Sequence, residues 1–191
     1  EQVRFRVADV QTGALEGPFD VAFSRMGTMF FAQPVAALKN VARALVPEGQ
    51  LSMVVWRRRE ANPCFHVAEQ VVRELLPTEP VIDAPTCGPG PFSMADPDLV
   101  SEQLAAAGFT EIAFRRNDAN LVIGRDLDPA ITFALTLGPA AERVRLAGPL
   151  FHERKDAIVA ALRDALAPHA DASGVRLPSS TWHITARRAG H

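Results

Sequence analysis

The sequence predicts an α/β fold whose sheet is doubly wound and mostly parallel. Two apolar runs, residues 19–24 and 51–56, are typical of buried strands, and apolar residues spaced three or four apart predict a helix from Pro34 between them. A strand, a helix and a second strand form a βαβ unit with parallel strands. Ligands of such sheets bind beyond the carboxyl ends of the strands, so residues 24–27 and 56–57 mark the expected site.

Further elements are predicted on both sides of this unit. Residues 3–8 alternate apolar and basic side chains, which predicts a half-buried edge strand that ends in an acid, Asp9. Pro47-Glu48-Gly49 is expected to end the helix and turn the chain into the second strand. Short strands are expected at 111–116 and 182–186. Proline after Asn, Asp or Gly predicts helix starts at Pro63, Pro97, Pro129, Pro139 and Pro149.

A proline-rich segment, residues 77–92, is expected to be a long loop and the most mobile internal part of the chain. Loops of this length often close over a binding site. Together with the helix before it, residues 57–95 are therefore expected to form a substrate lid.

Bulk composition excludes several classes of protein. The 191 residues suit a single domain, 1–191, and a net charge of −2 gives no attraction to nucleic acid or to an anionic membrane. No apolar run approaches the roughly 20 residues that span a bilayer. The two cysteines, Cys64 and Cys87, lack zinc-site spacing and suit a reducing compartment. We therefore expect a cytoplasmic protein with no metal site.

Four segments in order resemble the class I S-adenosylmethionine-dependent methyltransferases. In that family an acid follows the third strand, Phe-Asp opens the fourth, Leu-x-Pro-Gly-Gly precedes the fifth and Ala-Gly-Phe precedes the sixth. Here Glu48 replaces the first glycine of the turn. Residues 88–109 also look like the subgroup related to ubiquinone and menaquinone synthesis. The four matching segments are residues 3–11, 19–31, 43–56 and 105–114.

The resemblance implies a Rossmann-like, seven-stranded sheet with strand order 3-2-1-4-5-7-6, in which residues 182–186 insert antiparallel between 51–56 and 111–116. It also implies that the chain is the carboxyl-terminal two-thirds of the fold, incomplete on its amino-terminal side. The glycine-rich cofactor loop that follows the first strand has no counterpart here, and at about 30 residues per βαβ unit at least roughly 60 residues are missing.

Two expectations follow for the chain alone. It should bind S-adenosylmethionine poorly, so that the fragment is not competent as an enzyme by itself. It should also either pair with a second copy as a homodimer or leave residues 1–18 displaced, because strand 19–24 would have a bare edge.

The resemblance also implies the cofactor-binding residues. The carboxylate of Asp9 would accept a hydrogen bond from the adenine amino group, and the backbone amide of Val10 would meet the ring; the alternative for Asp9 is a solvated turn residue. Ser24, Arg25 and Met26 would lie against the methionine part of the cofactor, although Arg25 is equally compatible with a plain surface charge.

Candidate substrate-binding residues are apolar or cationic. Met29 and Phe30 would line a dry methyl-transfer pocket, since a sulfonium is attracted to aromatic faces, or would only seal the helix as core residues. Trp56 and Arg57 lie at the same strand ends, and Arg57 begins a basic run that suits an anionic substrate or a solvated surface. His66 is expected on a solvated helix face that it shares with Glu69 and Arg73, and no catalytic base is assigned.

The expected function is methyl transfer from S-adenosylmethionine to a small-molecule acceptor. The enzyme would mainly position the two partners and exclude water. The alternatives are a non-catalytic binding or dimerisation module and a nicotinamide-dependent oxidoreductase. An upstream reading frame with Gly-x-Gly-x-Gly after a strand would favour the methyltransferase, and a start codon near Glu1 would favour the module.

Overall fold

The computed structural model describes residues 3–76 and 89–190. The chain divides into two compact units. A sheet unit comprises Glu1–Arg57, Pro85–Asn117 and Thr181–His191, and a helical unit comprises Arg58–Ala84 and Asp118–Ser180. The helices and strands of each unit are described separately below. Most of the predicted loop at 77–92, and with it the test of its mobility, lies outside the described residues.

The sheet has the strand order β1-β2-β5-β3. β1 (Phe19–Arg25) pairs in parallel with β2 (Leu45–Trp56), and β2 pairs antiparallel with β5 (Gly174–Arg188). β3 (Phe109–Gly124) is the neighbour of β5. The parallel pairing and the insertion of the last strand are confirmed. The sheet is mixed, however, so a mostly parallel, seven-stranded sheet is not confirmed in the described residues. β3 and β5 are also much longer than predicted.

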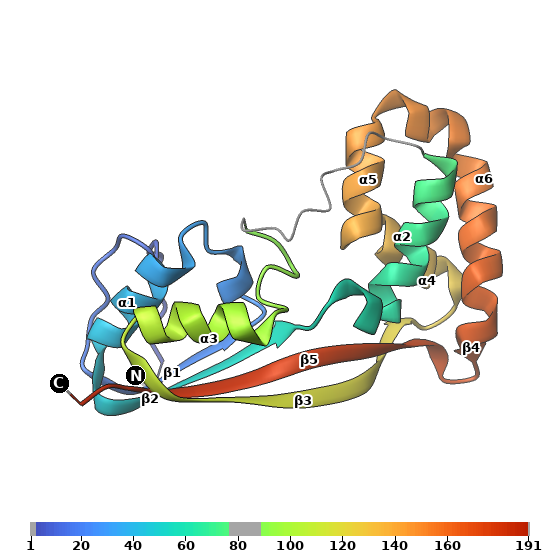
Figure 1. Ribbon diagram of the computed structural model, residues 1–191. Coiled ribbons are helices and arrows are strands. Elements are labelled where there is room, and N and C mark those ends of the chain that lie inside the picture. The colour runs from blue at the N-terminus through green and yellow to red at the C-terminus, as the bar shows by residue number, and fades with distance from the viewer. Residues whose placement is uncertain (1–2, 77–88, 191) are drawn as a thin grey trace. The chain divides into compact units, whose positions relative to one another are not determined.

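One face of the sheet unit carries both of its α-helices, α1 (Pro34–Ala44) and α3 (Pro97–Ala106), as Figure 1 shows. Alternate side chains of the strands pack against these helices, because successive strand residues point to opposite faces. The core on this side includes Leu38, Leu51, Met53, Val55, Val100, Leu104 and Ile184. On the other face Ser52 Oγ and His183 Nε2 lie 3.0 Å apart.

The helix-to-strand junction differs from the prediction. α1 ends at Ala44 and β2 begins at once at Leu45, which is buried and pairs with Phe19. Pro47-Glu48-Gly49 therefore lies within β2, where the pairing register with β1 shifts. Glu48 takes a positive φ of 63° there, a conformation that favours glycine.

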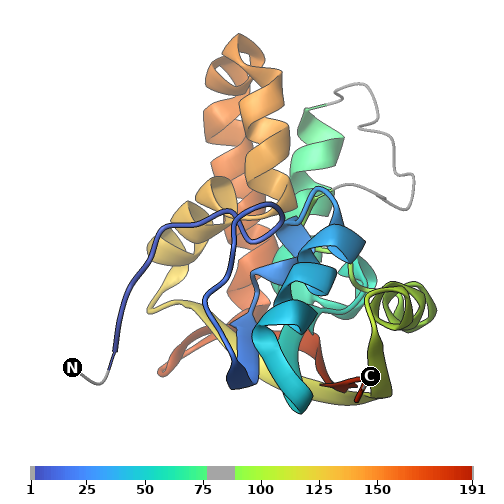
Figure 2. The ribbon, with the colours of Figure 1, turned by 90° about the vertical axis from the view of Figure 1, so that its left-hand side faces the viewer.

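Two predicted strands are more exposed than expected. β1 was predicted to be covered on both faces, yet it is the edge strand, and Phe19, Val21 and Phe23 are each at least half exposed. Residues 3–8 form no strand at all. They run as an extended arm with exposed side chains, visible near the N label in Figure 2. Alternation alone does not make a strand, because a strand also needs a partner for its backbone.

The helical unit contains α2 (Pro63–Leu75), α4 (Leu127–Thr136), α5 (Pro139–Ala147) and α6 (Pro149–Leu166), together with the short strand β4 (Ala170–Asp171) that pairs with β5. α2 packs on α5 and α6, and α4 packs on the same two helices. No helix in the described ranges has the length and apolar character needed to cross a bilayer. The unit's core includes Phe65, Ala68, Val72, Ile131, Ile158, Leu162, Leu166 and Leu177.

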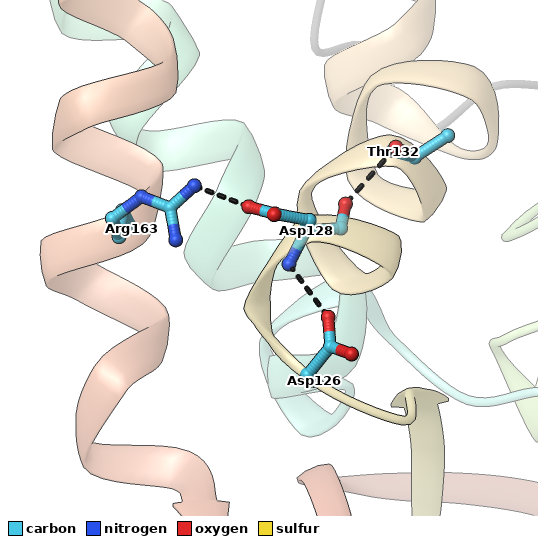
Figure 3. A network of polar contacts seen from close by, with 4 residues as sticks. All are labelled: Asp126, Asp128, Thr132 and Arg163. Atoms are coloured by element: carbon cyan, nitrogen blue, oxygen red, sulfur yellow. Dashed lines mark hydrogen bonds and ion pairs between the residues drawn. The ribbon is translucent and has the colours of Figure 1, made fainter.

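A capping bond explains where α4 begins, whereas α2 begins without one. α4 starts two residues earlier than expected, at Leu127 rather than Pro129, because Asp126 accepts the backbone N–H of Asp128 at 3.2 Å (Figure 3). The Asp128 carboxylate pairs in turn with Arg163 of α6. Asn62 precedes α2 as predicted but makes no capping bond; its side chain accepts the N–H of Ser180 at 2.8 Å.

Candidate functional site

The carboxyl end of β1 carries a strained turn. Met26 has a φ of 56°, a conformation that non-glycine residues rarely adopt, and its N–H donates to the carbonyl of Val54 at 2.8 Å. This bond continues the β1–β2 ladder by one residue, and Gly27 then turns the chain away. Residues held in sparsely populated backbone conformations cluster at functional sites. The turn stands where the predicted residues Ser24, Arg25 and Met26 leave the sheet.

A short 3-10 turn, η1 (Thr28–Phe30), follows and is tied to the segment before α3. The carbonyl of Met29 accepts the N–H of Gly90 at 3.0 Å and the hydroxyl of Ser93 at 2.6 Å. The Met29 side chain is packed in the core, whereas Phe30 is 54% exposed. Of the two predicted pocket residues, Phe30 is thus the one available for contact with a ligand.

Thr28 presents an unusual polar atom beside the strained turn. The residue is only 5% exposed, and its Oγ1 has no hydrogen-bond partner among the described residues. A buried hydroxyl without a partner costs about 1–3 kcal/mol. It is therefore suited to a hydrogen bond with a bound polar group. Sequence analysis missed Thr28, because a threonine in a loop gives no signal of its own.

The end of β2 carries an aromatic and cationic group. The guanidinium of Arg57 lies 4.6 Å from the ring centroid of Trp182, whose indole N–H donates to the carbonyl of Ala95 at 3.0 Å. Phe114 meets the same indole edge-on at 5.9 Å. Arg57 is thereby held against an aromatic face. This contact favours neither alternative of the sequence analysis, in which the basic run either binds an anionic substrate or is a solvated surface.

Asp9 lies in a tight exposed turn rather than at the end of a strand. Its carboxylate accepts the backbone N–H of Gln11 and the hydroxyl of Thr12, both at 2.9 Å. These hydrogen bonds, the one from the Gln11 backbone foremost, hold the pKa of Asp9 below its ordinary value. The carboxylate is thus ionised at neutral pH and faces solvent.

The Asp9 turn is docked onto α1. Asn40 of the helix donates from Nδ2 to the carbonyls of Val10 at 2.9 Å and Gly13 at 2.6 Å. The backbone N–H of Gln33, at the amino end of α1, donates to Gln11 Oε1 at 2.7 Å. Because Gln33 follows η1 closely in the chain, these bonds connect the predicted adenine-side residues Asp9 and Val10 to the segment after Met26.

The helical unit contains a buried ionic group that was predicted to be solvated. Glu69 is 5% exposed and pairs through Oε1 with Arg59 at 2.8 Å and with Arg143 at 3.5 Å. The prediction of a solvated α2 face is wrong at Glu69, because α5 packs against α2. His66, one turn earlier, is half-buried, and its Nδ1 has no hydrogen-bond partner among the described residues.

Comparison with known proteins agrees with the predicted class. A family described as methyltransferase domain matches residues 1–53, the segment that contains Asp9, the Met26 turn and most of β2. No curated protein matches the sequence. The matched residues therefore support the prediction of an S-adenosylmethionine-dependent methyltransferase.

Solved structures share the fold at low identity. The YcgJ protein from Bacillus subtilis is 17% identical and has a TM-score of 0.53, with 100% of this chain and 73% of that chain covered. A structure described as "Conversion of a Disulfide Bond into a Thioacetal Group during Echinomycin Biosynthesis" is also 17% identical, with a TM-score of 0.51 and coverage of 98% and 56%. These likenesses establish the α/β fold.

Proposed function

We propose that this protein transfers a methyl group from S-adenosylmethionine to a small-molecule acceptor. The observation that carries the proposal is the strained turn at Met26, which lies at the carboxyl end of a parallel strand and within the matched residues 1–53. Among the subgroups of this enzyme class, we favour the one related to ubiquinone and menaquinone synthesis, on the resemblance of residues 88–109.

The residues at this end of the sheet fit the polar parts of the cofactor. Backbone groups of Ser24, Arg25 and Met26 would lie along its methionine portion, and the unpaired hydroxyl of Thr28 is suited to one hydrogen bond there. The ionised Asp9 carboxylate is an acceptor for the adenine amino group, with the Val10 amide beside the ring. S-adenosylmethionine supplies a methyl group on a sulfonium, which leaves as a neutral thioether when the acceptor's nucleophile attacks.

The acceptor would bind next to aromatic surface. Phe30 is exposed at the edge of η1, and Trp56 ends β2. Arg57, held on Trp182, would lie beside the acceptor and help to keep water away from the reacting atoms. In this proposal catalysis rests on alignment of the two reactants, and no side chain is assigned as the base.

Calorimetric titration of S-adenosylmethionine into the complete gene product tests the proposal. Asp9→Ala should weaken binding by about 5- to 150-fold, as for one lost polar contact worth about 1–3 kcal/mol. Thr12→Val is the matched control, because it removes one hydrogen bond of the same turn and leaves the carboxylate in place. Its effect should stay below about threefold.

One result would contradict the proposal, and a second would contradict only the role given to Asp9. Absence of binding by the complete gene product would favour a non-catalytic module. Binding that Asp9→Ala leaves unchanged would remove Asp9 from the site while keeping the methyltransferase assignment. Product analysis by mass spectrometry with candidate hydroxyl, amine and carbon acceptors would then define the acceptor.

We place this activity in the cytoplasm, where the buried free thiol of Cys64 would remain reduced.

A further inference from the structure

The segment just before α3, residues 90–95, is folded into two tight turns, and we call it the strap. The N–H of Ser93 donates to the carbonyl of Gly90 at 3.2 Å, and the N–H of Ala95 donates to the carbonyl of Phe92 at 3.1 Å. Each of these bonds closes a turn of four residues. The strap therefore has a defined backbone conformation of its own, and the question is what it holds in place.

The strap is tied to two different parts of the sheet unit. On one side the N–H of Gly90 and the hydroxyl of Ser93 both donate to the carbonyl of Met29, at 3.0 Å and 2.6 Å. On the other side the carbonyl of Ala95 accepts the indole N–H of Trp182 at 3.0 Å. The first tie holds η1, which follows β1, and the second holds the strap to β5.

These ties place the strap at the ligand end of the sheet. β2 lies between β1 and β5 in the strand order, and Trp182 is opposite Val55, one residue before β2 ends at Trp56. A segment that is bound both to η1 and to Trp182 therefore runs across the carboxyl end of β2. This is the end of the sheet that carries the strained turn at Met26.

The tie to Met29 also fixes Thr28, its neighbour in η1. The Met29 carbonyl is held by two donors of the strap, and the Met29 side chain lies in the same buried core cluster as Met94. Because η1 has only three residues, the backbone of Thr28 follows that of Met29. The Thr28 hydroxyl is buried and has no hydrogen-bond partner among the described residues, so its position depends on the bond that Ser93 makes.

We propose that Ser93 is a positioning residue: through Met29 it holds the Thr28 hydroxyl in place for the amino-acid end of the bound cofactor. This inference rests on the proposed function. The methionine portion of S-adenosylmethionine ends in an ammonium and a carboxylate, which are its strong hydrogen-bonding groups. Since a hydrogen bond weakens steeply when its geometry is poor, loss of the Ser93 hydroxyl weakens this one contact and leaves the adenosine contacts intact.

Two ligands that differ only at the amino-acid end test the inference. S-adenosylhomocysteine and 5′-methylthioadenosine share the adenosine and the sulfur, but only S-adenosylhomocysteine has the ammonium and the carboxylate. Calorimetric titration measures the affinity of the complete gene product for each. Ser93→Ala should weaken S-adenosylhomocysteine by about 2- to 12-fold, the equivalent of one neutral hydrogen bond, and should change 5′-methylthioadenosine by less than about twofold.

Three further variants separate this role from a general effect on folding. Ser93→Thr keeps the hydroxyl and should bind both ligands as the unchanged protein does. Ser93→Cys keeps the size of the side chain but is only a weak donor, so it should show the same selective loss as Ser93→Ala. Ser52→Ala removes the half-buried hydroxyl that pairs with His183 on the other face of the sheet, and should change neither affinity. Circular dichroism checks that each variant is folded.

A double-mutant cycle tests whether Ser93 acts through Thr28. In a Thr28→Val background the hydroxyl that Ser93 positions is absent, so Ser93→Ala should then cause little further loss of affinity for S-adenosylhomocysteine. Additive losses would mean that Ser93 affects the cofactor by another route, and would overturn the inference.

The outcomes distinguish this inference from the proposed function. If the complete gene product binds S-adenosylhomocysteine and Ser93→Ala leaves that affinity unchanged, the inference is wrong and the proposed function stands. Equal losses for S-adenosylhomocysteine and 5′-methylthioadenosine would give Ser93 a purely structural role and would likewise overturn the inference alone. Absence of binding of both ligands by the complete gene product would reject the proposed function, and this inference with it.

Discussion

The guanidinium of Arg57 lies over the indole ring of Trp182, 4.6 Å from its centroid, although 125 positions separate them in the chain, since 182 − 57 = 125. The contact joins Arg57, the residue after β2, to β5, the strand that pairs with β2. In the β2–β5 register Val55 lies opposite Trp182 and Trp56 lies opposite Thr181, so Trp182 and Arg57, the residue after Trp56, lie near the same end of the sheet. An apolar ring thus covers the first arginine of a basic run.

Replacement of Arg57 by methionine should lower the free energy of unfolding by about 0.5–2 kcal/mol. The change keeps much of the side chain's volume but removes the cation–π attraction, whose usual size is in that range. Arg58→Met, at the exposed neighbouring position, should change stability by less than about 0.5 kcal/mol. Urea denaturation measures both. A double-mutant cycle with Trp182→Leu should show coupling between Arg57 and Trp182, and additive effects would argue against the contact.

Glu48→Gly should stabilise the protein by about 0.5–1 kcal/mol. Glu48 is exposed and has a φ of 63°, in the left-handed region that costs an L-residue about 1–2 kcal/mol and costs glycine almost nothing. The gain is reduced by the larger entropy that glycine adds to the unfolded chain. Glu48→Ala retains a Cβ and should bring no gain. Equal thermal midpoints for the glycine and alanine variants would contradict the argument.

Glu69→Ala should destabilise the helical unit by about 3–5 kcal/mol. The substitution leaves the guanidinium groups of Arg59 and Arg143 without the carboxylate that both contact, and removing one partner of a buried ion pair has this cost. Glu74→Ala, on the exposed face of the same helix, is the control and should cost less than about 1 kcal/mol. Hydrogen exchange of α2 and α5 would localise the effect, which should be absent from β1 and β2.

Stability should fall between about pH 9 and pH 11 because of Cys64. Burial raises the pKa of its thiol from 9.0 to about 11, so the thiol ionises in the unfolded chain at a lower pH than in the folded one. The unfolded state then binds fewer protons over this window, and the free energy of unfolding decreases as pH rises, by about 1–3 kcal/mol in total.

The composition makes this titration easy to isolate. The chain has no tyrosine, only two lysines, Lys39 and Lys155, and one cysteine besides Cys64, which is Cys87. Urea midpoints measured in a Cys87→Ser background should fall across the window. Cys64→Ala should remove most of that slope, whatever it does to stability at pH 7. A slope that survives the substitution would mean that Cys64 is not its origin.

Thr28→Val should have different effects on the stability of the protein and on its affinity for S-adenosylmethionine. Valine has nearly the shape of threonine and removes a buried hydroxyl that has no partner among the described residues, so stability should stay the same or rise by up to about 1 kcal/mol. Affinity for S-adenosylmethionine should fall if that hydroxyl bonds the cofactor. Thr132→Val is the control, because its hydroxyl donates to the carbonyl of Asp128 at 3.0 Å and should affect stability alone. An unchanged affinity for the Thr28 variant would remove Thr28 from the proposed site.

The sequence alone determined the βαβ unit and where its ligand end lies. Residues 19–24 and 51–56 are short apolar runs, and the helix between them carries a single apolar stripe, so their local pattern admits few other arrangements. Proline positions likewise predicted the starts of α2, α3, α5 and α6 to the residue. These features are local: each depends on residues within a few positions of one another.

Only the tertiary structure decided which predicted elements are paired and which side chains are buried. Residues 3–8 and β1 have similar alternating patterns, but burial depends on a neighbour that the pattern does not contain, and both are exposed. Glu69 resembles any polar residue on a helix face until α5 brings Arg143 against it. Arg57 likewise appears as one charge in a run of three until β5 places Trp182 beneath it. Contacts between residues far apart in the chain set the environment of each side chain, and local sequence does not encode those contacts.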